Sequence, residues 1–241
     1  DKIARDVSGQ ETSPSAMLFN NDGTILYVMG YTGDDINAYP LDTAYDISSY
    51  TSGTSIALDV SGQEINPTDM LFNQSGTILY VMGNTGDDIN AYPLDTAYDI
   101  SSYTSGTSIA LSVVGEETTP LAMLFNDDGT ILYVMGVDGD DINAYPLPTP
   151  YDISSYTSGT SIALSVAGEE TQPSAMLFNA DGTILYVMGQ TGDDINAYPL
   201  PTPYDISSYT SGTSIALSVG GEETAPIDML FNADGTILYV L

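Results

Sequence analysis

The chain has 241 residues, of which 33 are acidic and only two, Lys2 and Arg5, are basic, so its formal net charge is −31. Nucleic acid and membrane insertion are excluded: nucleic acid is bound through clusters of positive charge, and no stretch approaches the about 20 apolar residues of a membrane-spanning helix. Charge of one sign repels itself, which favours a saline, calcium-containing or extracellular setting where ions screen it.

Three residue types are missing altogether, namely cysteine, histidine and tryptophan. Disulfides and thiolate metal sites are therefore absent, and so is the imidazole that most often serves as a general base. Serine and threonine abound, but without such a base a nucleophilic triad is not expected.

The phrase MLFN begins at positions 17, 70, 123, 176 and 229, at a constant spacing of 53 residues. A period near 50 residues is typical of propeller blades and similar repeats, which bury their apolar faces against copies of themselves. We expect a single domain over residues 1–241, with repeats at about 14–66, 67–119, 120–172 and 173–225. A partial repeat combines 226–241 with 1–13.

Within the first repeat, four segments have the alternation or the β-branched and aromatic content of strands, and Asn21-Asp22-Gly23 between the first two suits a tight hairpin turn. The loop over residues 42–54 is expected to be anchored by Tyr45, Ile47 and Tyr50. The four strands, called a to d in chain order, are predicted at 16–19, 24–29, 35–41 and 55–60.

These strands predict an all-β fold, a β-propeller of four-stranded blades that each repeat after about 53 residues. Residues 2–11 align with residues 55–64, so the chain begins on a d strand. We therefore expect four full blades and a composite fifth, with strand d from the N-terminus and strands a and b from the C-terminus.

The composite blade has no c strand, which leaves an unpaired edge that could accept a strand of another copy. The predicted working state is head-to-tail self-association by strand addition. The residues expected to carry it are Lys2, Ile3, Arg5, Val7, Ile237, Tyr239 and Leu241.

The motif P-x-x-M-L-F-N-x-D-G-T-I-L-Y-V-M-G followed by D-D-I-N-A-Y resembles the blade of the YVTN-type propellers. Pro146 to Tyr156, PLPTPYDISSY, resembles the long-repeat relatives of that family with a P-W-D-I-S motif, found in bacterial surface and secreted proteins. The resemblance implies a propeller fold. It implies no catalytic residue, because the lactonase-type relatives use carboxylates and often histidine around a central metal, and this chain has no histidine.

The acidic residues cluster in two connections that a blade brings to one end, namely the b–c turn and the link from strand d to the next strand a. A crown of carboxylates there would suit a hard cation such as calcium, although solvated turn residues are the alternative. The expected ligands are Asp34, Asp35, Asp87, Asp88, Asp140, Asp141, Asp193, Asp194, Glu117, Glu170 and Glu223.

The remaining aromatic residues and the methionines are expected to pack in the interior of the protein. Four tyrosines are expected to pack between blades, with a glycan-stacking shelf as the alternative; they are Tyr27, Tyr39, Tyr45 and Tyr50. Met17 and Met29 are expected to fill the core. The phenylalanines are expected to be buried between blades; they are Phe19, Phe72, Phe125, Phe178 and Phe231.

DINAYPL is identical in its four copies, whereas an active site needs one blade to differ. This uniformity predicts a non-enzymatic structural or adhesive module of a secreted, cell-surface or filament-forming protein. The alternative is a cation- or small-ligand-binding propeller of lactonase-like ancestry that uses the acidic face.

Overall fold

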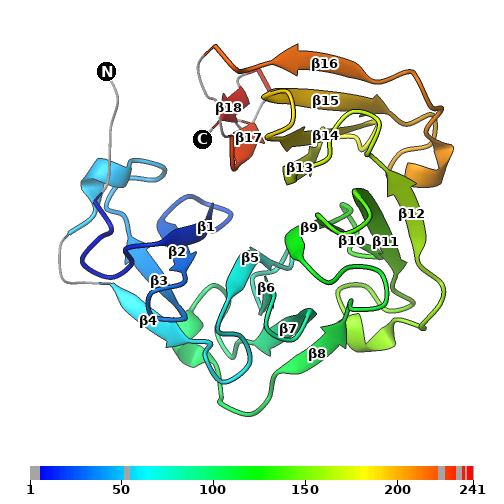
Figure 1. Cartoon of the computed structure of the whole chain (residues 1–241). Coiled ribbons are helices and arrows are strands. Elements are labelled where there is room, and N and C mark those ends of the chain that lie inside the picture. The colour runs from blue at the N-terminus through cyan, green and yellow to red at the C-terminus, as the bar shows by residue number, and fades with distance from the viewer. Residues whose placement is uncertain (1–5, 52–54, 222–225, 232–234, 237, 241) are drawn as a thin grey trace. The chain divides into compact units, whose positions relative to one another are not determined.

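A computed structural model describes residues 6–51, 55–221, 226–231, 235–236 and 238–240. The fold is all-β (Figure 1), and the chain divides into two compact units, residues 1–114 and 115–241. In the described residues no helix is long and apolar enough to cross a membrane.

The first unit contains two blades, each a four-stranded antiparallel sheet whose strands pair in chain order. Short turns join the first three strands of each blade, as the sequence predicts, whereas a longer loop joins the third strand to the fourth. The first blade consists of β1 (Pro14–Phe19), β2 (Ile25–Gly30), β3 (Asp35–Pro40) and β4 (Ile56–Asp59). The second consists of β5 (Pro67–Phe72), β6 (Ile78–Gly83), β7 (Asp88–Pro93) and β8 (Ile109–Ser112).

The second unit repeats this design and adds a short hairpin. Its first blade consists of β9 (Pro120–Phe125), β10 (Ile131–Gly136), β11 (Asp141–Pro146) and β12 (Ile162–Ser165). Its second blade consists of β13 (Pro173–Phe178), β14 (Ile184–Gly189), β15 (Asp194–Pro199) and β16 (Ile215–Ser218). The hairpin is formed by β17 (Met229–Phe231) and β18 (Leu238–Val240).

Strand b is buried on both faces, and its alternating side chains serve two different clusters. Tyr27 and Met29 of β2 pack with Met70 of the next blade, whereas Leu26 and Val28 pack with Tyr39 of β3. Because successive side chains of a strand point to opposite faces, one strand supports both layers. The run ILYVM is therefore apolar throughout rather than alternating.

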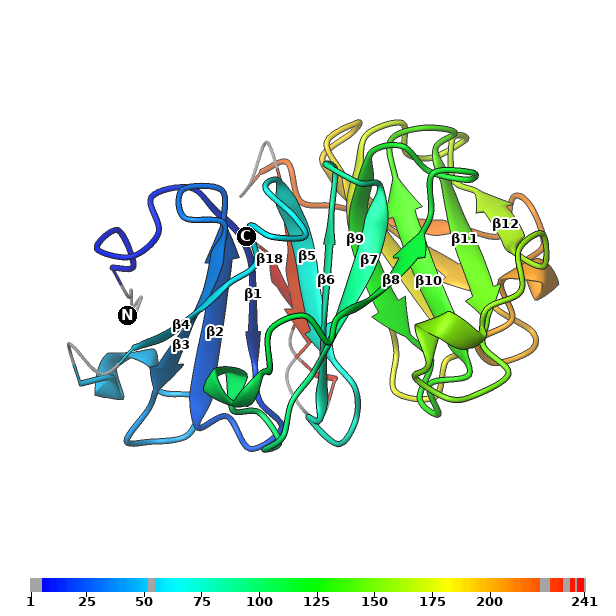
Figure 2. The same ribbon diagram turned by 90° about the horizontal axis from the view of Figure 1, so that it is seen from below.

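The c–d loop contains a 3-10 helix that we did not predict within the loop at 42–54. In the first blade Asp46 caps η1 (Ile47–Ser49) by accepting the Ser48 N–H at 3.0 Å. Figure 2 shows this helix at the end of the blade opposite the β2–β3 turn. The equivalent helices are η2 (Ile100–Ser102), η3 (Ile153–Ser155) and η4 (Ile206–Ser208).

Each c–d loop is also tied to the a–b turn by a tyrosine in the left-handed conformation. Tyr98 has a φ of 62°, and its N–H donates to the Gly76 carbonyl at 2.8 Å. A Cβ at Gly76 would overlap the Tyr98 ring, so only glycine fits at this turn position. The Tyr98 carbonyl in turn accepts the Tyr27 hydroxyl of the preceding blade at 2.5 Å.

The four predicted strands of each repeat are confirmed, but the burial predicted for the phenylalanines is only partly right. Phe72 lies against Tyr27 of the neighbouring blade, with ring centroids 4.9 Å apart, yet it is half-buried. The fully buried aromatic residues are tyrosines, among them Tyr27 and Tyr39, both 0% exposed. Tyr27 and Tyr39 therefore cannot form a glycan-stacking shelf, because a sugar would have no access to their faces.

The described residues do not form a composite fifth blade. β17 and β18 pair with each other as a two-stranded sheet, and residues 6–13 contain no strand. The Val7 carbonyl instead accepts the N–H groups of Gln10 and Glu11, each at 2.9 Å, in a turn. Among the predicted assembly residues, Tyr239 pairs with Leu230, and Lys2, Ile3, Arg5, Ile237 and Leu241 lie outside the described residues.

Met17 and Met70, which are equivalent in the 53-residue repeat, give a direct test of the packing. Met70 is 3% exposed within its cluster, whereas Met17, at the same position of the first repeat, is 42% exposed. We expect Met70→Ala to lower the free energy of unfolding by about 2–4 kcal/mol, because it leaves a cavity. Met17→Ala should cost less than about 1 kcal/mol. Urea denaturation measures both, and equal losses would contradict the assigned packing.

Candidate functional site

The acidic end of each blade is held together by a buried glutamate. Glu170 is 0% exposed, and its Oε1 accepts the N–H of Gln172 at 2.6 Å and that of Thr191 at 3.0 Å. These two amides belong to the d–a link and to the b–c turn. The carboxylate therefore fastens two connections together instead of facing solvent.

Glu117 performs the same task with the N–H groups of Thr119 and Asp138, at 2.8 and 3.2 Å. Burial raises the pKa of this carboxyl, and the two backbone hydrogen bonds oppose the shift. A Cβ at Gly136 would overlap the Glu117 side chain, which explains the glycine that ends each complete YVMG strand. Glu223 lies outside the described residues.

The paired aspartates of each b–c turn have separate structural uses. Asp140 has a φ of 48°, and its carbonyl accepts the Val166 N–H at 2.8 Å. Asp141 begins β11, and its Oδ1 accepts the Asn143 side-chain amide at 2.6 Å. Burial raises the pKa of Asp141. The same conformation recurs at Asp34, Asp87 and Asp193, and the same side-chain bond recurs at Asp35, Asp88 and Asp194.

These acids are brought to one end of each blade, as predicted, but they do not converge. Among the residues that the structure describes, no group of three or more acidic side chains is arranged to hold a metal ion. Calcium binding at this end stays a prediction.

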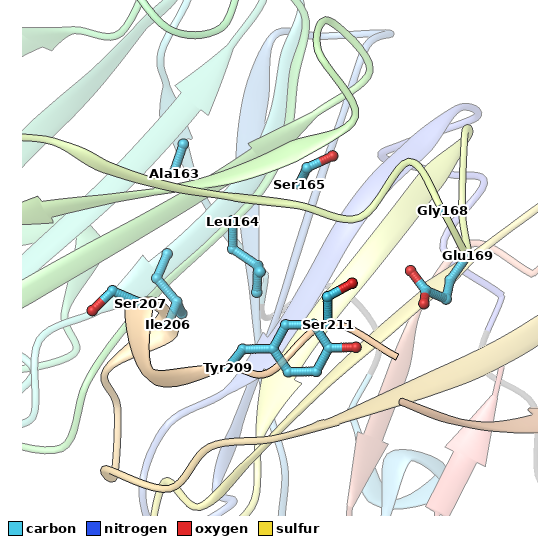
Figure 3. Close-up of a pocket in the computed structure, with 9 residues that line it drawn as sticks. All are labelled: Ala163, Leu164, Ser165, Gly168, Glu169, Ile206, Ser207, Tyr209 and Ser211. Carbon is cyan, nitrogen blue, oxygen red and sulfur yellow. The ribbon is translucent and has the colours of Figure 1, made fainter. Parts of the chain in front are cut away.

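A groove in the second unit lies between β12 of one blade and the η4 loop of the next, with a volume of about 460 Å³. Leu164 and Ile206 form its apolar floor and pack in one cluster. Figure 3 shows Glu169 at one end, with its carboxylate directed toward Tyr209. The groove is lined by Ala163, Leu164, Ser165, Gly168, Glu169, Ile206, Ser207, Tyr209 and Ser211.

The polar groups of this groove form a short network around Glu169. The Ser214 hydroxyl donates to Glu169 Oε1 at 2.8 Å, and the Tyr198 hydroxyl lies 3.5 Å from Oε2. Burial, and then the charge of Glu169, raise the pKa of Tyr198, so its hydroxyl stays protonated. The Tyr209 hydroxyl is buried and has no hydrogen-bond partner. The equivalent hydroxyls of Tyr103 and Tyr156 are buried without partners too, and buried groups of this kind are uncommon in folded proteins.

The repeats differ at this groove. In the first unit Gln63 stands where the second unit has Glu169, and Asp59 stands where it has Ser165. The Tyr92 hydroxyl donates to Gln63 Oε1 at 3.3 Å, so the amide keeps the tyrosine contact while losing the charge. This difference is present in the sequence, but its place in a groove depends on how the blades pack.

No known protein family matches the chain, and no curated protein matches it in sequence. Solved structures do match, and they define the class of the fold. A candidate 6-phosphogluconolactonase of Bacteroides uniformis has a TM-score of 0.61 at 14% identity, over 94% of this chain and 63% of its own. The periplasmic gluconolactonase PpgL of Pseudomonas aeruginosa has a TM-score of 0.54 at 17% identity, over 93% of this chain and 56% of its own.

The hydrazine synthase of Kuenenia stuttgartiensis also matches, with a TM-score of 0.58 at 14% identity, over 98% of this chain and 58% of its own. The chain is thus a β-propeller, and it spans less than two thirds of the length of these structures. At such low identity the likeness shows the fold alone. The YVTN-type resemblance is supported as a propeller, whereas membership of that family is not shown.

These matches correct the functional prediction. We predicted a non-enzymatic structural or adhesive module, and that prediction is wrong: lactonases recur among the matching structures, which favours the alternative of lactonase-like ancestry. DINAYPL is uniform, but the d–a link is not: its equivalent positions hold Gln10 and Gln63 in two copies and Glu116 and Glu169 in the next two.

The buried acids make stability depend on pH. Because the folded pKa of Asp141 is raised, its contribution to stability is complete below the unfolded pKa, near 3.8, and is lost as the pH rises through the folded value. Asp141→Asn should therefore raise the melting temperature at pH 7, with a gain that vanishes toward about pH 4. The substituted amide oxygen can still accept the Asn143 bond.

Asp128→Asn is the matched control with the opposite sign. The Thr130 hydroxyl and N–H lower the pKa of Asp128, so its contribution is present above the unfolded pKa and is lost as the pH falls through the folded value. This variant should be less stable than the parent at pH 7. Melting temperatures of the parent and both variants, measured between pH 3 and 8, test these two pKa directions. Parallel pH profiles for all three proteins would refute them.

Proposed function

We propose that the chain is a small-ligand-binding propeller that hydrolyses a neutral sugar lactone in the groove between β12 and η4. The observation that carries the proposal is the pairing of the Glu169 carboxylate with the unpartnered Tyr209 hydroxyl across one groove. The gluconolactonase fold of the matching structures supports the choice of reaction class.

The proposed chemistry needs only a base and a hydrogen-bond donor. Glu169 takes a proton from water as the water oxygen attacks the lactone carbonyl carbon. Tyr209 donates a hydrogen bond to the carbonyl oxygen as negative charge develops on it. The ring C–O bond then breaks, the leaving oxygen takes the proton back from Glu169, and the product is a hydroxy acid.

Two further groups hold the base in place. Ser214 donates to Oε1 of Glu169 at 2.8 Å, and Tyr198 lies 3.5 Å from Oε2, so the carboxylate is oriented from both sides. Ser165, Ser207 and Ser211 line the same groove and offer hydroxyl groups to a polyhydroxylated ring.

The charge of the chain favours a neutral substrate over a phosphorylated one. The net charge is −31, and the described residues that line the groove include no lysine or arginine. A phosphate group is normally bound by arginine, lysine or a helix N-terminus, and would here meet only acidic and neutral side chains.

We also propose an extracytoplasmic location. The large uniform charge is tolerated best in saline surroundings. One of the matching structures is a periplasmic protein.

Glu169→Gln tests the base. The substitution is expected to fold normally, because glutamine already occupies the equivalent position 63. Hydrolysis of glucono-1,5-lactone, followed by proton release above the uncatalysed rate, should fall about 100-fold or more in kcat, the usual loss for a general base. Binding of the non-hydrolysable lactam analogue, measured by calorimetry, should change little.

Glu116→Gln is the matched control. Glu116 accepts the Ser161 hydroxyl at 3.0 Å as Glu169 accepts that of Ser214, but Glu116 does not line this groove. The control should keep the parental rate. A lactonase lost in Glu116→Gln but kept in Glu169→Gln would overturn the site, and a parent protein without activity would overturn the function.

A further inference from the structure

The first unit repeats the residues of the groove almost without change. β4 contacts η2 in the first unit as β12 contacts η4 in the second, and we call this contact the β4–η2 interface. All but two of the residues that line the groove have an identical residue two repeats earlier in the chain. Those at the β4–η2 interface include Leu58, Gly62, Ile100, Ser101, Tyr103 and Ser105.

The β4–η2 interface also packs as the groove does. Leu58, Ile100 and Tyr103 belong to one hydrophobic cluster, and the equivalent residues of the groove belong to another. Leu58 and its counterpart Leu164 are both 9% exposed. The Tyr103 hydroxyl is buried without a hydrogen-bond partner, as the Tyr209 hydroxyl is. A buried donor of this kind costs free energy, so a ligand oxygen that accepts its proton stabilises the complex.

One of the two differences removes the base. Position 63 holds glutamine where the groove has Glu169. Gln63 is exposed, and its Oε1 accepts the Tyr92 hydroxyl at 3.3 Å. An amide donates and accepts hydrogen bonds but does not take up a proton near neutral pH, so Gln63 can bind a ligand without acting as a general base.

The other difference does not restore the base. Position 59 holds aspartate where the groove has Ser165, and Asp59 Oδ1 accepts the Ser61 N–H at 2.9 Å and the Ser61 hydroxyl at 2.6 Å. These bonds lower the pKa of Asp59, and a carboxylate with a lowered pKa is a weak base. Its negative charge also repels anions. The β4–η2 interface therefore favours a neutral ligand.

We propose that the β4–η2 interface is a second binding site for the neutral sugar lactone, which it binds without hydrolysing it. This inference rests on the proposed function of the groove, which supplies the class of ligand. Gln63 and the hydroxyl groups of Ser101 and Ser105 bind the polyhydroxylated ring, and Tyr103 donates to a ligand oxygen. The lactone is not hydrolysed there because position 63 has no carboxylate to activate water.

Photoaffinity labelling tests the second site directly. The probe is gluconolactam carrying a diazirine, which cannot be hydrolysed as a lactone. Residues 56–66 read IALDVSGQEIN and residues 162–172 read IALSVAGEETQ, so mass spectrometry of the digested chain distinguishes the two sites. Both segments should be labelled, and an excess of unlabelled gluconolactam should compete at both. Label confined to residues 162–172 would overturn the second site.

Gln63→Ala combined with Ser105→Ala should lower the labelling of residues 56–66 at least about tenfold, as expected for the loss of two hydrogen bonds. Both side chains are exposed, so this variant should fold as the parent does. Gln10→Ala is the matched control: Gln10 accepts the Tyr39 hydroxyl at 3.4 Å as Gln63 accepts that of Tyr92, but it lies outside the β4–η2 interface. The control should be labelled as the parent is.

Failure of the second site is distinguishable from failure of the proposed function. A parent that hydrolyses glucono-1,5-lactone but takes up no label at residues 56–66 would retain the function of the groove and overturn the second site. A parent that is labelled there competitively but has no hydrolytic activity would retain the second site and overturn the hydrolysis. Equal labelling of the parent and the double variant would also overturn the second site.

Discussion

The structure depends on one constraint, which is that a single blade cannot bury its own strand b. Tyr27 and Met29 reach a cluster completed by the following blade, and Leu26 and Val28 reach one completed by their own strand c. The hydrophobic effect therefore acts between blades as much as within them. A side chain such as Tyr27 also has its hydroxyl satisfied by the neighbour, through the Tyr98 carbonyl. The burial of apolar side chains and the hydrogen bonding of buried polar groups therefore both require a neighbouring blade.

The acidic residues show how a chain with a charge of −31 uses some of its carboxylates internally. Glu170 is buried because its oxygens are needed by the amides of Gln172 and Thr191, and those amides would otherwise be left without partners. Glu169, its neighbour in sequence, faces the groove instead. Adjacent residues in the same link therefore differ in role because their side chains leave the backbone in different directions.

The fold was largely predictable, because the MLFN spacing and the strand patterns depend on local sequence that repeats almost unchanged. The groove was not. It is formed by Leu164 of one blade and Tyr209 of the next, residues whose proximity depends on how blades pack rather than on any local pattern. Glu117 was predicted as a cation ligand because sequence shows charge, but its bonds to backbone amides become visible only in three dimensions.

Tyr98, a single strained residue of the c–d loop, connects this loop to the a–b turn of its own blade and to strand b of the preceding blade. Its left-handed backbone is maintained by the Gly76 carbonyl, its ring covers the a–b turn, and its own carbonyl is bonded by Tyr27 of the preceding blade. A displacement of the c–d loop in one blade must therefore disturb either the turn beneath it or the strand beside it. In the second unit Tyr204 makes the same bonds, with its N–H donating to the Gly182 carbonyl and its carbonyl accepting from the Tyr133 hydroxyl, and its loop carries η4, which lines the groove. Occupation of the proposed groove would in this way be coupled mechanically to the blade before it, which would give a chain of near-identical repeats a physical route to cooperative behaviour.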